Sequence, residues 1–327
     1  MIRIPPRGPS SLVLLGLMLC TSGCLFESAE NPMSASTDTG GSGTPQIMLV
    51  PESLYILQAT DIYSTSWPQA FQNYRFIVCN PSITYMDVAR IHHDLPGVTA
   101  LAYINIQDLL FDQYPNSPYW QVFAAVFDTS WCVRDLPTNR VIRVQGYTGV
   151  PGSGLMHAIP HLRNMETRGR FYRDATMAAG WDGLDIDQSH QDYPWWRKPI
   201  VQEQSSNFDV DGDGVTDTID DLAQKYVAGR AILTMRLRQE LGNSAYLVAN
   251  SGGPLADPNL NGITIENVGV KWTVTQATGF LQAQKAVGRT PFIAAGWVIS
   301  ASNVTPTRTL ARTVPGCCYG RDPGHYH

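Results

Sequence analysis

Two acidic residues lie close together in the segment GWDGLDIDQSHQDYP, residues 180–194. If its central part forms a strand, alternate side chains face opposite sides, so Asp185 and Asp187 share one face and Leu184 and Ile186 the other. Carboxylates at such short range raise the pKa of one of them, which can keep that acid protonated near neutral pH. The segment therefore predicts an acid pair, with Asp187 at the carboxyl end of a strand.

A further acid occupies the same kind of position in the later segment NGITIENVG, residues 261–269. The isoleucines of this predicted strand share one face, and Glu266 lies on the other. Glycoside hydrolysis requires two carboxyl groups that flank the scissile bond. We expect Asp187 and Glu266 to form that pair and Asp185 to tune Asp187, although an aspartate at a strand end is also a common turn or cap residue.

Strand-like and helix-like segments alternate along the chain. The strand-like segments cover residues 54–59, 75–79, 99–104, 181–186, 245–250, 262–267 and 291–298. The clearest helix-like segments cover residues 82–95, 219–241 and about 305–313. This alternation predicts a parallel sheet of βαβ units, and the number of strands favours a (β/α)₈ TIM barrel over an open doubly wound sheet. No glycine-rich phosphate loop follows any of these strands, which disfavours nucleotide binding.

The last residues leave the predicted barrel one strand short. The tail VPGCCYGRDPGHYH, residues 314–327, has no clear strand pattern. It is either a degenerate closing strand or the product of a truncation or frame shift. In either case the barrel would place Asp187 and Glu266 at one mouth, because active-site groups lie at the carboxyl ends of barrel strands.

The acidic segment also carries a family resemblance. The pattern G-x-D-G-[LIV]-x-[LIV]-D on GWDGLDID, with ALAYINIQD upstream and NGITIEN downstream, resembles TIM-barrel glycosyl hydrolases. The groups concerned are hypothetical glycosyl hydrolase family 15 and the endo-α-1,4-polygalactosaminidase-like barrels, and the resemblance covers roughly residues 50–300. It implies a (β/α)₈ fold in which Asp187 of the fourth strand and Glu266 are catalytic.

The same segment is similar to the chitinase motif DGxDxDxE, but Ser189 stands where that motif has its final glutamate. This departure disfavours the substrate-assisted chitinase mechanism. It also keeps open a different class of protein, a non-catalytic carbohydrate-binding barrel that uses the same cleft. A third alternative is a metal-dependent hydrolase with a transition metal at His190 and the pair Asp185 and Asp187.

Aromatic and polar side chains near the predicted strand ends are candidates for binding a carbohydrate polymer. Sugar rings stack on flat apolar faces, whereas their hydroxyls need hydrogen-bonding partners. The candidates are Tyr103, Asn105, Asp108, His190, Trp195, Trp196, Asn250 and Trp297.

The segment FDVDGDGVTDTIDDL, residues 208–222, matches the ligand series of a calcium loop. Oxygen ligands at positions 1, 3, 5, 7, 9 and 12 with a glycine at 6 are typical of an EF-hand. We expect a structural Ca²⁺ in a loop over 209–220, inserted after the fourth strand; the alternative is an acidic solvated turn. The ligands would be Asp209, Asp211, Asp213, the carbonyl of Val215, Asp217 and Asp220.

The chain begins with an export signal. Arg3 and Arg7 precede the apolar run LVLLGLML, and the segment TSGC ends at Cys24. The run is too short for a permanent membrane span but fits a signal peptide. We expect a lipoprotein-type signal peptide over 1–23, lipidation of Cys24, a flexible Ser/Gly/Thr linker over 24–47 and the barrel over 48–327. Thr21 departs from the usual lipobox leucine, so ordinary cleavage and secretion remain the alternative.

Composition excludes several classes of protein. The 327 residues are 43% hydrophobic and 16% charged, which is enough apolar material for a core and rules out a disordered chain. The formal net charge of −5 disfavours nucleic acid as a partner, because such binding needs a basic field. We expect an exported monomer in the bacterial cell envelope, anchored to the membrane by its lipid, or a secreted one.

Overall fold

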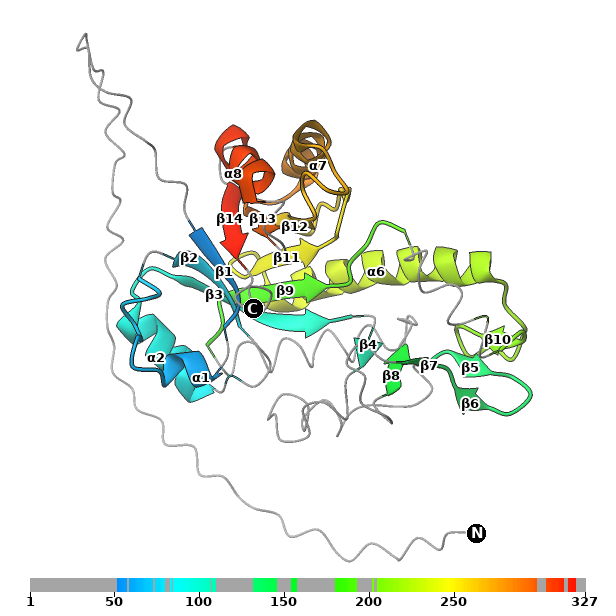
Figure 1. Ribbon diagram of the computed structural model, residues 1–327. Coiled ribbons are helices and arrows are strands. Elements are labelled where there is room, and N and C mark those ends of the chain that lie inside the picture. Colours follow the sequence, from blue (N-terminus) through cyan, green and yellow to red (C-terminus); the bar gives the residue numbers. More distant parts are fainter. Residues whose placement is uncertain are drawn as a thin grey trace, which may run out of the picture. The chain divides into compact units, whose positions relative to one another are not determined.

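Among the described residues, eight parallel strands form one sheet that closes on itself (Figure 1). Their spatial order is β1-β14-β13-β12-β11-β9-β3-β2, and β1 pairs with both β14 and β2. The strands are β1 (Glu52–Leu57), β2 (Tyr74–Cys79), β3 (Thr99–Asn105), β9 (Gly183–Asp187), β11 (Tyr246–Asn250), β12 (Gly262–Glu266), β13 (Ala294–Val298) and β14 (Cys317–Arg321).

This computed structural model describes residues 52–57, 59–72, 74–79, 83, 85–106, 108–109, 132–145, 154–157, 180–192, 202, 205–298, 304–314 and 317–321. All of them belong to one compact unit, residues 48–327. None of the helices in these ranges combines the length and the hydropathy that a membrane span requires.

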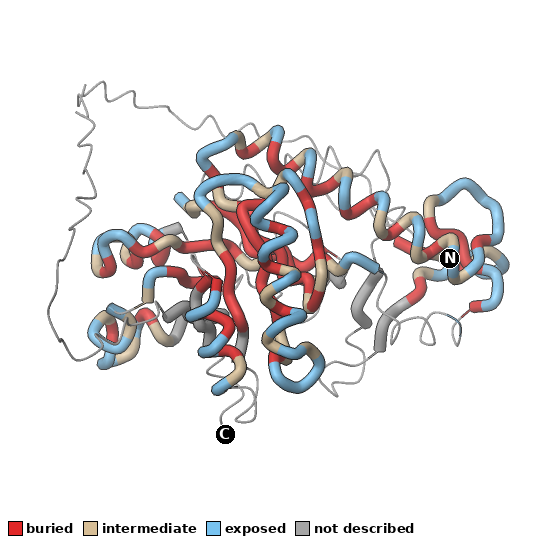
Figure 2. The backbone as a smooth tube through the Cα atoms, turned by 90° about the horizontal axis from the view of Figure 1, so that it is seen from above, coloured by how far each residue is buried: buried red, intermediate tan, exposed pale blue. Residues whose placement is uncertain are grey.

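Strands of a parallel sheet are usually covered on both faces and are therefore apolar on both. The inward face contributes a small core of Phe76, Val78, Leu101, Val248 and Ala295. The outward face, which includes Leu184 and Ile186, packs against the helices in a larger core. Figure 2 shows the result: the strands are mostly buried, whereas buried and exposed stretches alternate along the helices.

The described helices are α1 (Ala59–Ile62), α2 (Tyr85–Asp94), α6 (Ile219–Leu241), α7 (Val274–Val287) and α8 (Val304–Thr313). Helix α7 packs on β12, and α8 packs on β13 and β14. Capping boxes begin α6 and α7, in which Thr218 and Thr273 each accept a hydrogen bond from the backbone three residues later.

Helix α6 contributes to two cores. The side chains of Leu233, Leu237 and Leu241 pack in the large core around the sheet. Those of Leu222 and Tyr226, nearer its beginning, pack with Val133, Ile142, Phe208 and Val210 in a separate small core. The first half of α6 therefore packs in the small core, and its second half packs against the barrel.

Two small antiparallel sheets accompany the barrel. One has the order β10-β5-β6 and contains β10 (Phe208–Asp209), β5 (Arg134–Asp135) and β6 (Arg140–Val141). The other has the order β4-β8-β7 and contains β4 (Asp108–Leu109), β8 (Gly154–His157) and β7 (Arg143–Gln145). The first of these sheets carries the acidic loop, which begins in β10.

The predicted α/β class with a curled, mostly parallel sheet is confirmed. Each strand-like segment overlaps a strand of the sheet, and the helix predicted over 219–241 has those bounds in the structure. Of the two alternatives for the tail, the structure has the closing strand: residues 317–321 form β14, which pairs with β13 and β1. The small sheets were not predicted, because their strands of two to four residues carry no readable alternation.

Candidate active site

Strand β9 places its two aspartates on the inner face of the sheet. Asp185 is fully buried and Asp187, at the carboxyl end, is 8% exposed. In the parallel register Asp185 lies beside Tyr103 of β3 on one side and Val248 of β11 on the other. Asp187 lies beside Asn105 of β3. The side chains of Asp185 and Asp187 therefore share one face of β9, as the alternation in the sequence predicted.

The hydroxyl of Tyr103 donates a hydrogen bond of 2.5 Å to Oδ2 of Asp187. Burial, followed by the negative charge of Asp187, raises the pKa of the Tyr103 phenol well above its usual range. The phenol therefore stays neutral and serves as a donor. Tyr103 was predicted to bind sugar, and that stays a prediction; the structure adds that its hydroxyl is bonded to the Asp187 carboxylate.

Asp185 has the most unusual environment in the site. Both of its carboxyl oxygens are buried without a hydrogen-bond partner. Burial, followed by the charges of Asp187 and Glu266, raises the pKa of Asp185 well above its ordinary value. We infer that Asp185 is a neutral acid at neutral pH. Sequence reasoning named the like charges as the cause, whereas burial is the larger one.

Glu266 ends β12, two strands from β9, with β11 between them. The side-chain amide of Asn250, the last residue of β11, donates a hydrogen bond of 2.8 Å to Oε1 of Glu266. Two strand spacings put the backbones of Asp187 and Glu266 on the order of 10 Å apart, and both side chains face the interior. Both charges act on Asp185. The two predicted carboxyls therefore share one mouth.

Several more polar atoms are buried at this end of the sheet without a partner. Besides Asp185 they are Oδ1 of Asn250, Oγ1 of Thr264 and Oγ of Ser189. Buried polar groups are normally hydrogen-bonded, so these unpartnered atoms distinguish this end of the sheet from an ordinary apolar core. Thr264 and Ser189 were not predicted as candidates, although Thr264 precedes Glu266 by two residues and shares its face.

The structure describes the remaining predicted binding residues to different extents. Both ring nitrogens of His190 face protein oxygens: Nδ1 lies 2.7 Å from the Ser251 carbonyl and Nε2 3.1 Å from Oε1 of Gln188. Asn105 is buried beside Asp187. Asp108 lies in β4, and Trp297 lies in β13 in register with Glu266, but the structure describes only their backbones. Trp195, Trp196 and Cys24 lie outside the described residues.

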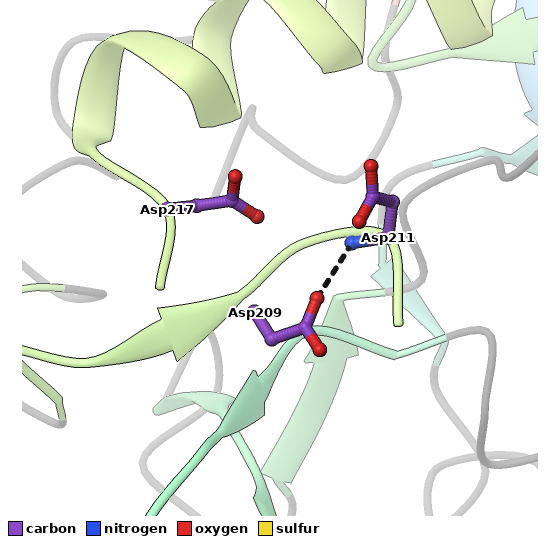
Figure 3. Close-up of side chains that lie close together, drawn as sticks. All are labelled: Asp209, Asp211 and Asp217. Atoms are coloured by element: carbon purple, nitrogen blue, oxygen red, sulfur yellow. Dashed lines mark hydrogen bonds between the residues drawn. The ribbon is translucent and has the colours of Figure 1, made fainter. Parts of the chain in front are cut away.

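Three of the predicted calcium ligands converge in the acidic loop. One carboxylate oxygen from each of Asp209, Asp211 and Asp217 lies within 4.8 Å of the others (Figure 3). Asp209 also folds the loop, because its carboxylate accepts the backbone N–H groups of Asp211, Gly212 and Gly214.

The other predicted ligands do not join this group. Asp213 accepts the N–H of Val215 at 2.8 Å, and Asp220 is exposed in the first turn of α6. The ammonium of Lys225 lies 2.7 Å from both Asp211 and Asp217. Burial lowers the pKa of Lys225, but the hydrogen bonds and charges of the two carboxylates outweigh it and raise the pKa. The converging group is therefore neutralised in part by a side chain of the protein.

Comparison with known proteins adds the fold. The sequence matches no family model and no curated protein. A cycloisomaltooligosaccharide glucanotransferase from Paenibacillus sp. is similar in structure, with a TM-score of 0.50 and 12% identity over 77% of this chain and 39% of that one. This chain thus spans about two-fifths of the glucanotransferase.

Two further solved structures are similar to a lesser degree. The glycoside hydrolase domain of PelA from Pseudomonas aeruginosa has a TM-score of 0.48 and 12% identity over 84% of this chain and 96% of that one. The GH36 α-galactosidase AgaA from Geobacillus stearothermophilus has a TM-score of 0.48 and 10% identity over 85% and 39%. The statement on the fold rests on the glucanotransferase, whose TM-score reaches 0.50; at 12% identity that likeness concerns the fold alone, a TIM-barrel-like α/β fold.

Proposed function

We propose that this protein is an exported glycoside hydrolase that cleaves a polysaccharide or oligosaccharide with the carboxyls of Asp187 and Glu266. The observation that carries the proposal is the pairing of each acid with one neutral donor at one mouth of the barrel. Tyr103 donates to Asp187 and Asn250 donates to Glu266. Two separately held carboxyls at the carboxyl ends of strands are the arrangement that glycoside hydrolysis requires.

The two acids divide the reaction between them. One acts as nucleophile or as base toward water. The other donates its proton to the leaving glycosidic oxygen as the bond from that oxygen to the anomeric carbon breaks. Asp185, as a neutral acid, adds no third negative charge beneath the pair.

Substitution of each carboxyl tests the proposal. We expect Asp187→Asn and Glu266→Gln to lower kcat on a cleaved polymer by about 10³-fold or more while sugar binding persists. The first measurement is a screen of the purified domain against a polysaccharide panel that includes amino-sugar polymers, with released reducing ends as the readout. If the wild-type protein binds a polymer but releases no product from any, the protein is a carbohydrate-binding barrel instead.

The acidic loop is proposed to bind a structural Ca²⁺. The oxygen-only donor set of Asp209, Asp211 and Asp217 suits a hard cation. A bound ion would take the place of the Lys225 ammonium, and Asp213 would have to turn inward to join its ligands. We expect Ca²⁺ to raise the Tm and Mg²⁺ to do so less, with chelator-treated protein as the reference. An unchanged Tm across the calcium titration would leave the loop as an acidic turn closed by Lys225.

Export and anchoring are part of the same proposal. Residues 1–23 would be removed, Cys24 would be acylated, and residues 24–47 would tether the barrel to the membrane as a monomer. Labelling of cells with a fatty-acid analogue tests this, since a Cys24→Ser variant should lose the label and enter the soluble fraction. Equal labelling of both proteins would contradict the lipid anchor.

A further inference from the structure

The turn after Asp187 is held by a buried tyrosine of α6. Gln188 has a left-handed backbone with φ of 59°, which is costly for a residue other than glycine. The hydroxyl of Tyr226 donates to the Gln188 carbonyl and accepts the backbone N–H of His190 at 3.1 Å. Tyr226 is 1% exposed. One fully buried hydroxyl thus closes the turn that directly follows the catalytic aspartate.

The same turn is tied to the loop after β11. The backbone N–H of Ser189 donates to the Asn250 carbonyl at 3.1 Å. The imidazole Nδ1 of His190 donates to the Ser251 carbonyl at 2.7 Å. Gly252 packs against this ring so closely that a Cβ there would lie 3.1 Å from its Cε1 atom. The loop that receives these bonds begins with Asn250, the residue that holds Glu266.

The loop after β12 is tied to the same central loop from the other side. The indole Nε1–H of Trp272 donates to the Gly252 carbonyl at 2.7 Å. Asn267, which directly follows Glu266, is also left-handed, with φ of 60°, and its carbonyl accepts the N–H of Trp272 at 3.3 Å. Both catalytic acids are therefore followed at once by a strained turn, and both turns are bonded to residues 250–252.

We propose that His190 and Trp272 are positioning residues that set the separation between Asp187 and Glu266. The connection runs from Gln188 through His190 to the Ser251–Gly252 backbone, and from there through Trp272 to Asn267. The inference rests on the proposed hydrolase function. It also assigns His190 a different task from sugar binding, because both of its ring nitrogens already face protein oxygens.

A matched pair of tryptophans provides the test. Trp272 and Trp67 each donate Nε1–H over 2.7 Å, to Gly252 and to Asp94 respectively, and each ring lies 5.1 Å from a phenylalanine. Trp67 packs in the core of α1 and α2, away from the catalytic strands. We therefore compare Trp272→Phe with Trp67→Phe.

We expect Trp67→Phe to lose at least as much Tm as Trp272→Phe, because Trp67 is more buried and donates to a carboxylate. Only Trp272→Phe should lower kcat, by about tenfold or more with KM changed less than about threefold. A second readout needs no substrate. The ¹³C signal of the Glu266 carboxyl, identified by its loss in Glu266→Gln, should titrate with a midpoint moved by about half a pH unit in Trp272→Phe, because the repulsion between the acids depends on their distance. Trp67→Phe should leave that midpoint in place.

A pair of glycines covers the case in which Trp272→Phe fails to fold. A Cβ at Gly253 would lie 2.8 Å from Cζ2 of Trp272, whereas a Cβ at Gly279 in α7 meets nothing within 4 Å. Gly253→Ala should shift the Glu266 midpoint and Gly279→Ala should not. The positioning role would be wrong if neither Trp272→Phe nor Gly253→Ala changed kcat or the midpoint of the Glu266 titration. Absence of turnover in the wild type would instead overturn the hydrolase function, and the carboxyl titration alone would then decide the positioning role.

Discussion

Asp185 makes a pH-dependent contribution to stability that can be measured without a substrate. Its pKa is raised in the folded protein, so folding favours the protonated form. Its contribution is fully present below the pKa of the unfolded chain, about 3.9. It is lost as the pH rises toward the folded pKa, since the unfolded chain then releases a proton that the folded protein keeps. The Asp185→Asn variant carries no such proton and escapes this loss.

The magnitude follows from linkage. While Asp185 stays protonated in the folded state and ionised in the unfolded state, the free energy of unfolding falls by about 1.4 kcal/mol per pH unit relative to the variant. Between pH 5 and 7 the difference between Asp185→Asn and wild type should thus grow in favour of the variant by up to about 3 kcal/mol. An amide without partners has its own cost of about 1–3 kcal/mol, which shifts the whole curve but not its slope.

The assay is urea unfolding of both proteins at half-unit steps from pH 4.5 to 7.5, followed by tryptophan fluorescence. Asp135 supplies a control of opposite sign, because hydrogen bonds from Ser205 and Thr138 lower its pKa. Asp135→Asn should lose stability relative to wild type above the unfolded pKa, and the difference should vanish as the pH falls. Parallel wild-type and Asp185→Asn curves over the whole range would refute the assignment of Asp185 as a buried neutral acid.

Further predictions concern single contacts. Tyr103→Phe removes the donor to Asp187, so Asp187 loses a contact that orients it and kcat on the polymer identified by the screen should fall by about tenfold or more; an unchanged kcat would contradict this. Thr218→Ala removes the capping box of α6 and should cost about 1 kcal/mol in urea unfolding; an unchanged midpoint would contradict this. Asp257→Ala leaves the buried Arg230 without its 3.3 Å partner and should cost about 3–5 kcal/mol in the same assay, whereas a loss below 1 kcal/mol would contradict the buried pair.

Most strands of the sheet could be predicted because their segments are short and apolar, and those of β3, β9, β11 and β12 are largely buried on both faces. The acids at 185, 187 and 266 stood out for the same reason, as charged residues in apolar segments whose alternation places them inward. β14 was harder to predict, since its segment CCYGR shows no alternation of apolar and polar residues and contains a glycine, and only its pairing with β13 and β1 identifies it as a strand. A segment that pairs with a neighbouring strand on each side can form a strand even where its own β-propensity is low.

The contacts of the acids and of the turn after Asp187 could not be predicted, because they join elements that lie far apart in sequence. Tyr103 is separated from Asp187 by 84 positions in the sequence, and Tyr226 of α6 is separated from Gln188 by 38. Aromatic character alone suggested that Tyr103 faces a sugar ring. The parallel register of β3 and β9 also directs its hydroxyl to a carboxylate, a contact that aromatic character alone does not predict.

The acidic loop and the turn after Asp187 are bonded to consecutive residues of α6. Lys225 bonds Asp211 and Asp217 of the loop, and Tyr226 bonds the Gln188 carbonyl in the turn. A cation that displaced the Lys225 ammonium would therefore act on the helical turn that also carries Tyr226. Through these two neighbouring side chains, order in the acidic loop is linked to the backbone that directly follows Asp187.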